Sequence, residues 1–473
     1  MAPVDVAWFH IDGPVNLAQV TGIVLTRKPL DFARVKAVFS ARLRRFPRFR
    51  QRVVERGFPI AAPCWEDMPD FAIEQQLHHV ALPAPHDEAA LSDLISDLAG
   101  TPLDRERPLW QAHVVDGVGG GSALIMRIHH CVGDGTAMMA VIRHLFDATR
   151  AAAVIPAASA APACAGPART GSPIAYALDA IAASARTSLA ALGAGLDTVM
   201  HPQQALAKAA MVLDGVAMLA TELLKAPDPK SPLKGKFGMK KRVAWSEPVA
   251  LDDVKAIGAP LGAKINDVLV AAMTGALRTY LHGRGVDVNH TTVRAMVPVD
   301  LRPPERAAEL GNEFGLVILE LPVHHRSASQ RLRTTKARMD ALKRSPEAAA
   351  VLTLFSLFGR SPKAVEDLAV DLFGSKASLV MTNVAGPRKT LYLAGVPIDR
   401  LMFWVPHPGR QLGMGISILS YRGTASLAVI ADARLVPDPE TIAREFNREF
   451  ARMLAAARRR DAKSASASVA TRA

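Results

Sequence analysis

The sequence has few cysteines and no long hydrophobic run. Its three cysteines, Cys64, Cys131 and Cys164, form neither a zinc-binding pattern nor a disulfide framework, and their odd number fits a reducing compartment. Because no uninterrupted apolar stretch reaches about 18 residues, no membrane-spanning helix is predicted. Residues 1–12 lack a basic segment followed by an apolar one, so no secretory signal is evident. We therefore expect a cytoplasmic protein.

Apolar and basic residues are both plentiful. The 473 residues are 49% hydrophobic and 21% charged, which excludes a wholly disordered chain. At about 150 residues per domain, two or three domains are expected. The net charge of +13 favours anionic partners, namely nucleic acid, acidic lipid or a phosphorylated small molecule. Nucleic acid is the weakest of these, because aromatic residues make up only 5% and no recognition motif is present.

Composition divides the chain into four parts. We predict an N-terminal domain over 1–150, an Ala/Pro-rich linker and helical connector over 151–241, a second domain over 242–458, and a flexible tail over 459–473. Hydrophobic periodicity in the first part predicts strands and helices. The predicted strands are Gln19–Thr26 and Ser122–His130, and the predicted helices are Phe32–Phe46 and Thr136–Arg150.

The most informative stretch runs from His129 to Gly135, between a predicted strand and a predicted helix. Neighbouring residues of a strand point to opposite faces, so His129 and His130 cannot both face one ligand. His130, at the strand end, is the candidate for chemistry, while His129 is expected to be structural. Asp134 lies in a tight Gly-Asp-Gly turn, where it could hydrogen-bond the turn or pair with a basic residue. The alternative is an ordinary corner with two structural histidines.

The pattern HHxxxDG resembles the signature of the coenzyme-A-dependent acyltransferases, and specifically that of the bacterial wax ester synthase/diacylglycerol acyltransferase family. Other blocks are similar to this family in the same order. They are Pro108-Leu109-Trp110, Asn266-Asp267, Val297–Pro303, Leu310–Gly315 and Met381–Pro387. Thr382 and Ala385 stand where the family commonly has Ser and Pro. The resemblance covers nearly the whole chain.

The resemblance implies a fold and a reaction. The fold would be α/β, with two chloramphenicol-acetyltransferase-like domains side by side and an active-site tunnel between them. The reaction would move a long-chain acyl group from acyl-CoA, as co-substrate, to a fatty alcohol (wax ester) or to diacylglycerol (triacylglycerol). His130 would be the general base in a ternary complex, and no permanently bound cofactor or metal is expected. An acyltransferase acting on a polyketide, peptide or carrier-protein acceptor is an alternative, and so is a non-catalytic lipid-binding protein.

The resemblance also assigns roles to other residues. Asp134 would support the site through a salt bridge to Arg302, although Arg302 could instead be a solvated turn residue. Asn266, Thr382 and Asn383 would contact the oxyanion or the acceptor. The alternatives are that Asn266 caps a helix and that the other two end a strand. Gly135 is placed at the co-substrate. Trp110 and Cys131 are expected to fill space in the core.

The basic segments have two interpretations. Long-chain alcohols and diacylglycerols reside in membranes or lipid droplets, whose anionic surfaces attract lysine and arginine. The lysine-rich Lys225–Lys241 and the run Arg458–Arg460 are therefore candidates for peripheral docking on the inner face of the membrane or on a droplet. Solvated linker and tail charges are the alternative.

Overall fold

The computed structural model describes residues 1–55, 63–150, 227–229, 231–306, 309–343, 351, 370–371, 374–407 and 411–470. All of these belong to one compact unit. The predicted linker and the predicted helical connector lie outside the described residues, apart from the residues that lead into the second half from 227.

The first mixed sheet is built mainly from the N-terminal part of the chain. Its strands lie in the order β12 (Tyr392–Leu393), β13 (Val396–Trp404), β1 (Gln19–Thr26), β6 (Gly121–His129), β5 (Trp110–Val118) and β4 (Leu77–Ala81). Strands β12 and β13 come from the second half of the chain, yet β13 pairs antiparallel with β1. The sheet therefore crosses the predicted boundary at 242, and the predicted domain limits stay a prediction.

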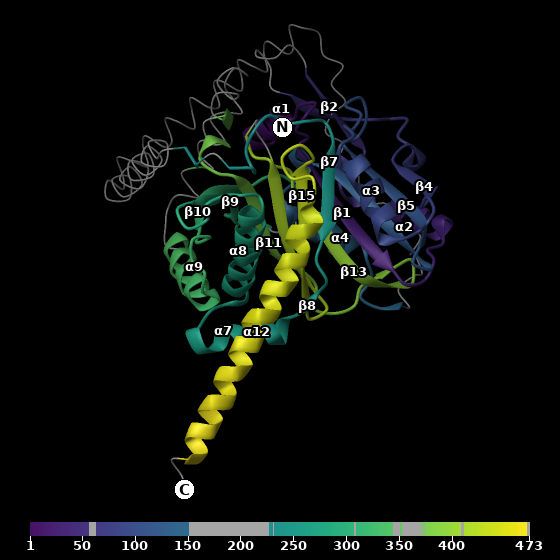
Figure 1. Ribbon diagram of the computed structural model, residues 1–473. Helices are drawn as coiled ribbons and strands as arrows, with labels where there is room; N and C mark the ends of the chain where they lie inside the picture. Colours follow the sequence, from purple (N-terminus) through teal and green to yellow (C-terminus); the bar gives the residue numbers. More distant parts are fainter. Residues whose placement is uncertain are drawn as a thin grey trace, which may run out of the picture. The chain divides into compact units, whose positions relative to one another are not determined.

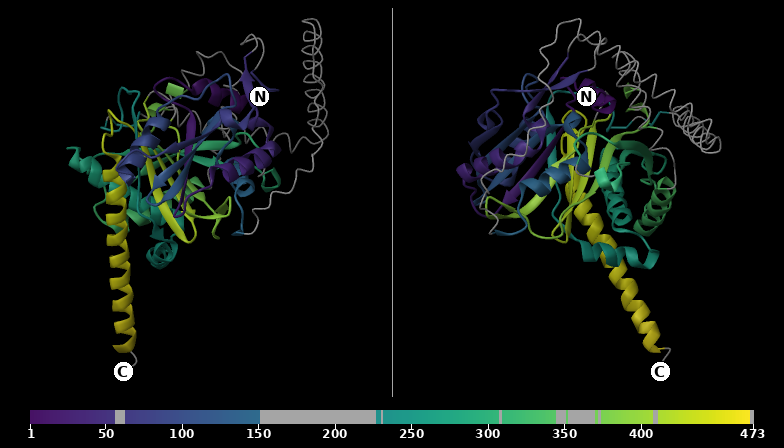
Figure 2. Two further views of the ribbon diagram at one scale, coloured as in Figure 1. Left: turned by 90° about the vertical axis from the view of Figure 1, so that its right-hand side faces the viewer. Right: turned by 180° about the vertical axis from the view of Figure 1, so that it is seen from behind.

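The second sheet is built from the C-terminal part. Its order is β10 (Phe314–Leu321), β9 (Val293–Asp300), β11 (Leu379–Ala385), β14 (Met414–Tyr421), β15 (Thr424–Asp432) and β7 (Lys241–Trp245), and β8 (Val249–Ala250) also pairs with β15. Strand β11 runs parallel to both of its neighbours. A separate hairpin joins β2 (Gln51–Val54) to β3 (Cys64–Asp67). Figure 2 shows the purple to blue strands of the N-terminal part beside the green to yellow strands of the C-terminal part.

Helices cover these sheets (Figure 1). The α-helices are α1 (Pro3–Ile11), α2 (Phe32–Arg42), α3 (Glu88–Ala99), α4 (Gly135–Leu145), α7 (Leu251–Gly258), α8 (Ile265–Gly283), α9 (Ala328–Leu342) and α12 (Pro439–Ala470). The short 3-10 turns are η1 (Leu43–Arg45), η2 (Pro47–Phe49), η3 (Ile73–Gln75), η4 (His130–Val132), η6 (Ala259–Leu261) and η7 (Pro304–Arg306).

Two hydrophobic cores are found among the described residues, and they hold the unit together. In the first, α8 is apolar on all sides through its middle and packs with α12 against the second sheet. The other core joins the two sheets, because Ile125 of β6, Trp404 of β13 and Ile430 of β15 belong to one buried cluster. Burial of this shared cluster stabilises the packing of the two sheets against each other.

No single described helix is long and apolar enough to span a bilayer. Helix α8 passes that test of length and composition only together with Leu251–Leu261, from which it is bent by 96°. In the structure, α8 lies in the core of the second sheet.

The predicted strand Gln19–Thr26 is confirmed to the residue, whereas two predicted helices are shorter. Helix α2 ends at Arg42 rather than Phe46, because Pro47 disfavours helical backbone at the residue before it. Helix α4 ends at Leu145 rather than Arg150, because the backbone N–H and C=O of Asp147 pair with Tyr392.

Two further expectations concern Trp110 and the tail. Trp110 is buried, and its ring N–H donates to Phe49 O, which confirms core packing. The predicted tail is helical as far as Ala470, because no Gly or Pro interrupts α12 after its first residue. Figure 1 shows the last turns of α12 extending beyond α7. Whether these turns are flexible stays a prediction.

Candidate active site

The turn between β6 and α4 carries the candidate base. Strand β6 ends at His129, and His130 opens the 3-10 turn η4, so the predicted strand is one residue too long. Asp134 is the N-cap of α4, and its Oδ1 accepts from Ala137 N at 3.0 Å. Asp134 thus marks both the end of the turn and the start of the helix. The next residue, Gly135, is exposed at the N-terminus of α4.

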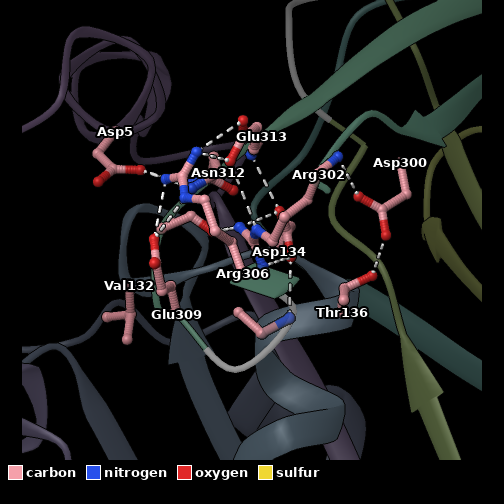
Figure 3. A network of polar contacts seen from close by, with 12 residues as sticks. Asp5, Val132, Asp134, Thr136, Asp300, Arg302, Arg306, Glu309, Asn312 and Glu313 are labelled. Carbon is pink, nitrogen blue, oxygen red and sulfur yellow. Dashed lines mark hydrogen bonds and ion pairs between the residues drawn. The ribbon is translucent and has the colours of Figure 1, made fainter. Parts of the chain in front are cut away.

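Asp134 forms a buried ion pair with Arg302 from the second half of the chain. Arg302 Nη1 lies 3.2 Å from Asp134 Oδ1, and Nη2 lies 2.8 Å from Oδ2. Both side chains are almost fully buried, at 2% and 7% exposed. The predicted salt bridge is therefore confirmed, and its two-pronged geometry is the strong form of an Arg–carboxylate contact (Figure 3). The alternative, a solvated Arg302, is wrong.

The same aspartate organises the loop after Arg302. Asp134 Oδ2 accepts from Glu313 N at 3.0 Å, and Asp134 N donates to Gly311 O at 3.1 Å. Arg302 Nη2 donates to the same carbonyl at 2.8 Å. Gly311 and Glu313, which flank Asn312, are thus both hydrogen-bonded to the ion pair, and this holds the loop against the histidine turn.

Asn312 holds the ring of His130. Its Nδ2 donates to Asp5 Oδ1 at 2.8 Å and to His130 O at 2.8 Å, and both of these atoms are acceptors. Its Oδ1 must therefore be the atom that lies 3.0 Å from His130 Nδ1. Because a carbonyl oxygen only accepts, Nδ1 carries the hydrogen. This leaves the lone pair of the neutral ring on Nε2.

Asp5 anchors this arrangement from α1. Its Oδ1 also accepts from Asn312 N at 3.0 Å, and its Oδ2 lies 3.0 Å from Arg48 Nη2. Burial raises the pKa of Asp5, while Arg48 and Asn312 act in the opposite direction. Arg48 Nη1 in turn donates to Val132 O at 2.8 Å, in the histidine turn itself. The chain of contacts closes on the turn where it began (Figure 3).

The His130 ring stacks on one aromatic ring and contacts a second, tilted one at the edge of a cavity. Trp8 lies parallel to it with ring centroids 4.0 Å apart, and Phe314 lies at 5.6 Å. Desolvation lowers the pKa of His130 to about 4, although the hydrogen bond to Asn312 acts in the opposite direction. The imidazole is therefore neutral near pH 7. Among the described residues, Nε2 has no hydrogen-bond partner.

His129 takes a different position. It is 3% exposed, its Nδ1 accepts from Cys131 N at 3.1 Å, and its Nε2 lies 3.7 Å from Asp12 Oδ2. It does not line the cavity, as strand alternation predicts. Cys131 is fully buried, and burial raises the pKa of its thiol well above the usual range. Neither side chain is available to a substrate in the cavity.

The cavity itself has a volume of about 470 Å³ and is walled by both sheets and by α4. Its wall is mostly apolar. The polar side chains in the wall include His130, Asp134, Thr136, Asp300, Thr382 and Asn383. A mostly apolar cavity with a few polar groups is typical of a site for a small, largely apolar ligand. Gly135 also lines it, where a Cβ would contact Val384 at 3.8 Å.

The structure brings the three remaining candidates together, but only two of them line the cavity. Thr382 and Asn383, on β11, line the cavity, whereas Asn266 does not. Asn266 accepts a hydrogen bond of 2.6 Å from Asn383 Nδ2 and so orients it. Asn266 is not a helix cap, because α8 begins after Lys264, and Asp267 Oδ2 accepts from Lys264 N.

Four further residues of the site, Asn312, Asp5, Trp8 and Arg48, were not predicted from the sequence. Asn312 belongs to the Leu310–Gly315 block, which was recognised as a motif without a role. Asp5 and Trp8 lie in α1, whose sequence carries no motif that points to the site. Among the described residues, no group of three His, Cys, Asp or Glu side chains could hold a metal ion.

Comparison with family models identifies both halves of the chain. Residues 1–269 match the wax ester synthase/diacylglycerol acyltransferase catalytic domain, and residues 310–454 match the WS/DGAT C-terminal domain. A probable diacylglycerol O-acyltransferase of Mycobacterium tuberculosis (strain ATCC 25618 / H37Rv) is 28% identical over 463 residues, which cover 95% of this chain and 94% of the relative. Another from the same strain is 29% identical over 401 residues, 83% of each chain.

Solved structures show the same fold. The wax ester synthase/diacylglycerol acyltransferase from Marinobacter aquaeolei VT8 has a TM-score of 0.68 at 20% identity, over 97% of this chain and 100% of that one. The first condensation domain of the calcium-dependent antibiotic synthetase has a TM-score of 0.57 at 17% identity, over 95% and 93%. The predicted fold class of two α/β domains is confirmed.

The ion pair between Asp134 and Arg302 yields a stability prediction. We expect Arg302→Ala to lower the free energy of unfolding by about 3–5 kcal/mol, because it leaves a buried carboxylate without its partner. Arg306→Ala is the control, since that side chain is half exposed and water screens its ion pairs, so its loss should change stability little. Denaturant unfolding measures both. A loss from Arg302→Ala as small as that of the control would contradict a buried, coupled pair.

The contact between Asn312 and His130 yields a kinetic prediction. In Asn312→Ala the ring loses the acceptor that selects its tautomer, so kcat should fall by about one to two decades while KM changes little. Asn289→Ala, at an exposed asparagine, is the matched control. Steady-state kinetics gives kcat and KM of each variant, and its melting temperature shows whether a lower rate comes from lost stability. If the melting temperature fell while kcat was unchanged, Asn312 would be structural only.

Proposed function

Since this chain belongs to the wax ester synthase/diacylglycerol acyltransferase family, we propose that it transfers a fatty acyl group from acyl-CoA to the hydroxyl of a long-chain alcohol or a diacylglycerol, with His130 as the general base. The observation that carries this proposal is the ring of His130 at the cavity wall, with its Nδ1 held by Asn312. A neutral imidazole with a free Nε2 is what the deprotonation of an alcohol requires.

The proposed reaction is a direct transfer. Nε2 takes the proton from the hydroxyl as its oxygen attacks the thioester carbonyl, forming a C–O bond. When the tetrahedral intermediate collapses, the C–S bond breaks and the departing thiolate receives the proton from the imidazolium. Both substrates must therefore be bound together. The burial and raised thiol pKa of Cys131, outside the cavity wall, support a route without a cysteine-bound acyl intermediate.

The intermediate also needs a hydrogen-bond donor for its oxyanion. We assign this role to Thr382, which lines the cavity and whose hydroxyl has no hydrogen-bond partner among the described residues. A hydroxyl stands where the family commonly has Ser, so the same donor chemistry is retained. Asn383, the next residue of the strand, also lines the cavity and is held by Asn266.

We also propose that the protein contacts a lipid surface. Met239 is 66% exposed, and it stands between Lys236 and Lys240, which are also exposed. An apolar side chain flanked by lysines suits the surface of an anionic membrane or droplet. Two members of the predicted basic segments are already paired: Lys241 with Asp432 in the interior, and Arg458 with Asp253. Lys225 and Lys230 lie outside the described residues.

The principal test compares the two histidines. We expect His130→Ala to lower the rate of thiol release from palmitoyl-CoA by about two or more decades, with hexadecanol or diacylglycerol as acceptor, because the hydroxyl loses its base. The His129→Ala variant should keep more of the activity, in proportion to its folded fraction. Equal loss in both variants at equal melting temperatures would contradict the assignment of the base to His130.

The pH profile is a second test. A general base acts in its deprotonated form, so kcat/KM falls when the pH drops through the pKa of His130, which burial lowers to about 4. We therefore expect kcat/KM to be constant between about pH 5.5 and 8. Rates of thiol release in a constant-ionic-strength buffer series measure this. A fall centred near about pH 6.5, the value of an ordinary imidazole, would contradict the desolvated ring.

A further inference from the structure

Helix α4 lies along the segment that begins at the end of β11. At the start of the helix, a Cβ on Gly135 would lie 3.8 Å from the side chain of Val384. Beyond the other end of the helix, the backbone N–H and C=O of Asp147 pair with those of Tyr392, both at 2.8 Å. Residues 384–392 therefore accompany α4 from one end to the other. We call the line of contact between α4 and these residues the α4 seam.

The cavity reaches the protein surface along this seam. Its wall includes Gly135 and Arg143 of α4 and Asn383 and Ala385 of β11, and all four of these residues are exposed. Gly135 lies next to the histidine turn, and Arg143 follows it by eight residues, or about 12 Å along the helix. A ligand whose reacting group lies at His130 can thus extend to the surface along α4.

Basic side chains lie along the seam without a partner. Arg143 is on the helix, and Arg388 and Lys389 lie in the segment that accompanies it, between the contacts at Val384 and Tyr392. All three basic residues are exposed, and none has a hydrogen-bond or ion-pair partner among the described residues. Their charges are therefore available to a ligand.

Two more basic residues come from the first half of the chain. Arg42 reaches the end of α4, where its Nη1 donates to Leu145 O at 2.9 Å and its Nη2 lies 2.7 Å from Asp147 Oδ1. This contact already supplies the cation that the C-terminal end of a helix favours. The turn η1, which follows Arg42, carries Arg44 and Arg45. Both are exposed and, within the part of the chain that the structure describes, also lack a hydrogen-bond or ion-pair partner.

The two ends of the seam differ in charge. At the end near His130, the cavity wall includes the exposed carboxylate of Asp300, whose Oδ2 accepts from Thr136 Oγ1 at 2.6 Å. The other end carries the unpaired basic residues, which we call the seam cluster. They are Arg44, Arg45, Arg143, Arg388 and Lys389. This arrangement favours a ligand whose negative charge is remote from its reacting group.

Coenzyme A has this distribution of charge. Its thiol end is uncharged, and its phosphate groups lie beyond the pantetheine arm. The arm has about 13 bonds from the sulfur to the nearest phosphorus and spans about 16 Å when extended, at about 1.25 Å per bond for ordinary bond lengths and angles. The distance of about 12 Å along α4, together with the reach of an arginine side chain, matches this length.

We propose that the seam cluster binds the phosphate groups of the acyl-CoA, and that the α4 seam holds its pantetheine arm. The inference rests on the acyl transfer proposed above, because it gives a place to the donor of that reaction. Arginine and lysine bind phosphate through charge-assisted hydrogen bonds, which are about twice as strong as those between neutral groups. The acyl group then lies at His130, at the inner end of the arm.

The test compares hexanoyl-CoA with hexanoyl-pantetheine, which lacks the phosphate groups. Both donors are soluble, so thiol release to a short alcohol is measured without a lipid surface. The variants are Arg143→Ala and the double variant Arg388→Ala/Lys389→Ala. Arg333→Ala is the matched control, because Arg333 is also an exposed arginine of a helix, α9, without a partner among the described residues. Melting temperatures establish that each variant is folded.

The expected result is a loss of binding for one donor only. Arg143→Ala and the double variant should each raise KM for hexanoyl-CoA about tenfold or more and change kcat little, because a charge-assisted hydrogen bond to phosphate is lost. With hexanoyl-pantetheine, both variants should behave as the wild type. The control should match the wild type with both donors. Added salt should raise the wild-type KM for hexanoyl-CoA alone.

Equal effects on both donors, or no effect on either, would overturn the proposal while acyl transfer itself stood. Anionic vesicles containing phosphatidylglycerol offer phosphate from another source. If the variants lost binding to these vesicles and kept the wild-type KM for hexanoyl-CoA, the seam cluster would bind lipid and the proposal would be wrong. If Arg143→Ala does not fold, the double variant decides alone.

Calorimetric titration with CoA gives a readout that does not depend on turnover. The wild type should bind CoA about tenfold or more tightly than either variant, and equal affinities would contradict the proposal. If the wild-type protein released no thiol from either donor, acyl transfer would be contradicted instead, and the titration would still decide whether the seam cluster binds CoA.

Discussion

The paired carboxylate and guanidinium of Asp134 and Arg302 hold the site together. Asp134 ends the histidine turn and caps α4, while Arg302 lies two residues beyond the end of β9 in the other half of the chain. The pair also hydrogen-bonds to the backbone of Gly311 and Glu313 and so fixes the position of the loop residue that lies between these two. A buried charge pair needs all of its hydrogen bonds to offset the loss of hydration. Here those bonds come from the segments that must meet for His130 to face the cavity.

A second carboxylate completes the clamp from the other side. Asp5 accepts from the backbone and the side chain of Asn312, and Arg48 ties Asp5 to the histidine turn. Asn312 is therefore held at its backbone N–H by Asp5 and at its side-chain amide by Asp5 and the backbone carbonyl of His130. This orientation decides which nitrogen of His130 carries the hydrogen. The aromatic stack with Trp8 then keeps the ring dry and neutral, so that its basic nitrogen is ready without a change in protonation.

The two sheets contribute different groups to the wall of the cavity. The first sheet and α4 present the base and a hydrocarbon wall, and β11 of the second sheet presents a hydroxyl and an amide. Strand β13 crosses from the second half into the first sheet and packs in the core that joins the two. The halves are thus held by covalent continuity, by a shared core and by an ion pair. These three constraints together fix the position of the cavity wall that a substrate contacts.

Local patterns were enough to predict much of this protein. Alternation of side chains in Ser122–His130 separated the roles of the two histidines, and the β-branched run Gln19–Thr26 predicted a strand to the residue. The HHxxxDG block and the motifs that follow it predicted the family, the fold class and the contact between Asp134 and Arg302. These signals succeed because strand period, turn chemistry and motif spacing act over a few residues.

Only the tertiary structure decided the rest. Asp5 and Arg48 reach His130 through Asn312, far along the chain, and no local pattern encodes a hydrogen bond across such a separation. The end of α4 depends on Asp147 pairing with Tyr392, which lies in the second half of the chain. The sequence by itself determined which residues have the chemistry. Folding decided which of them meet, because long-range contacts arise from packing of the whole core rather than from neighbouring residues.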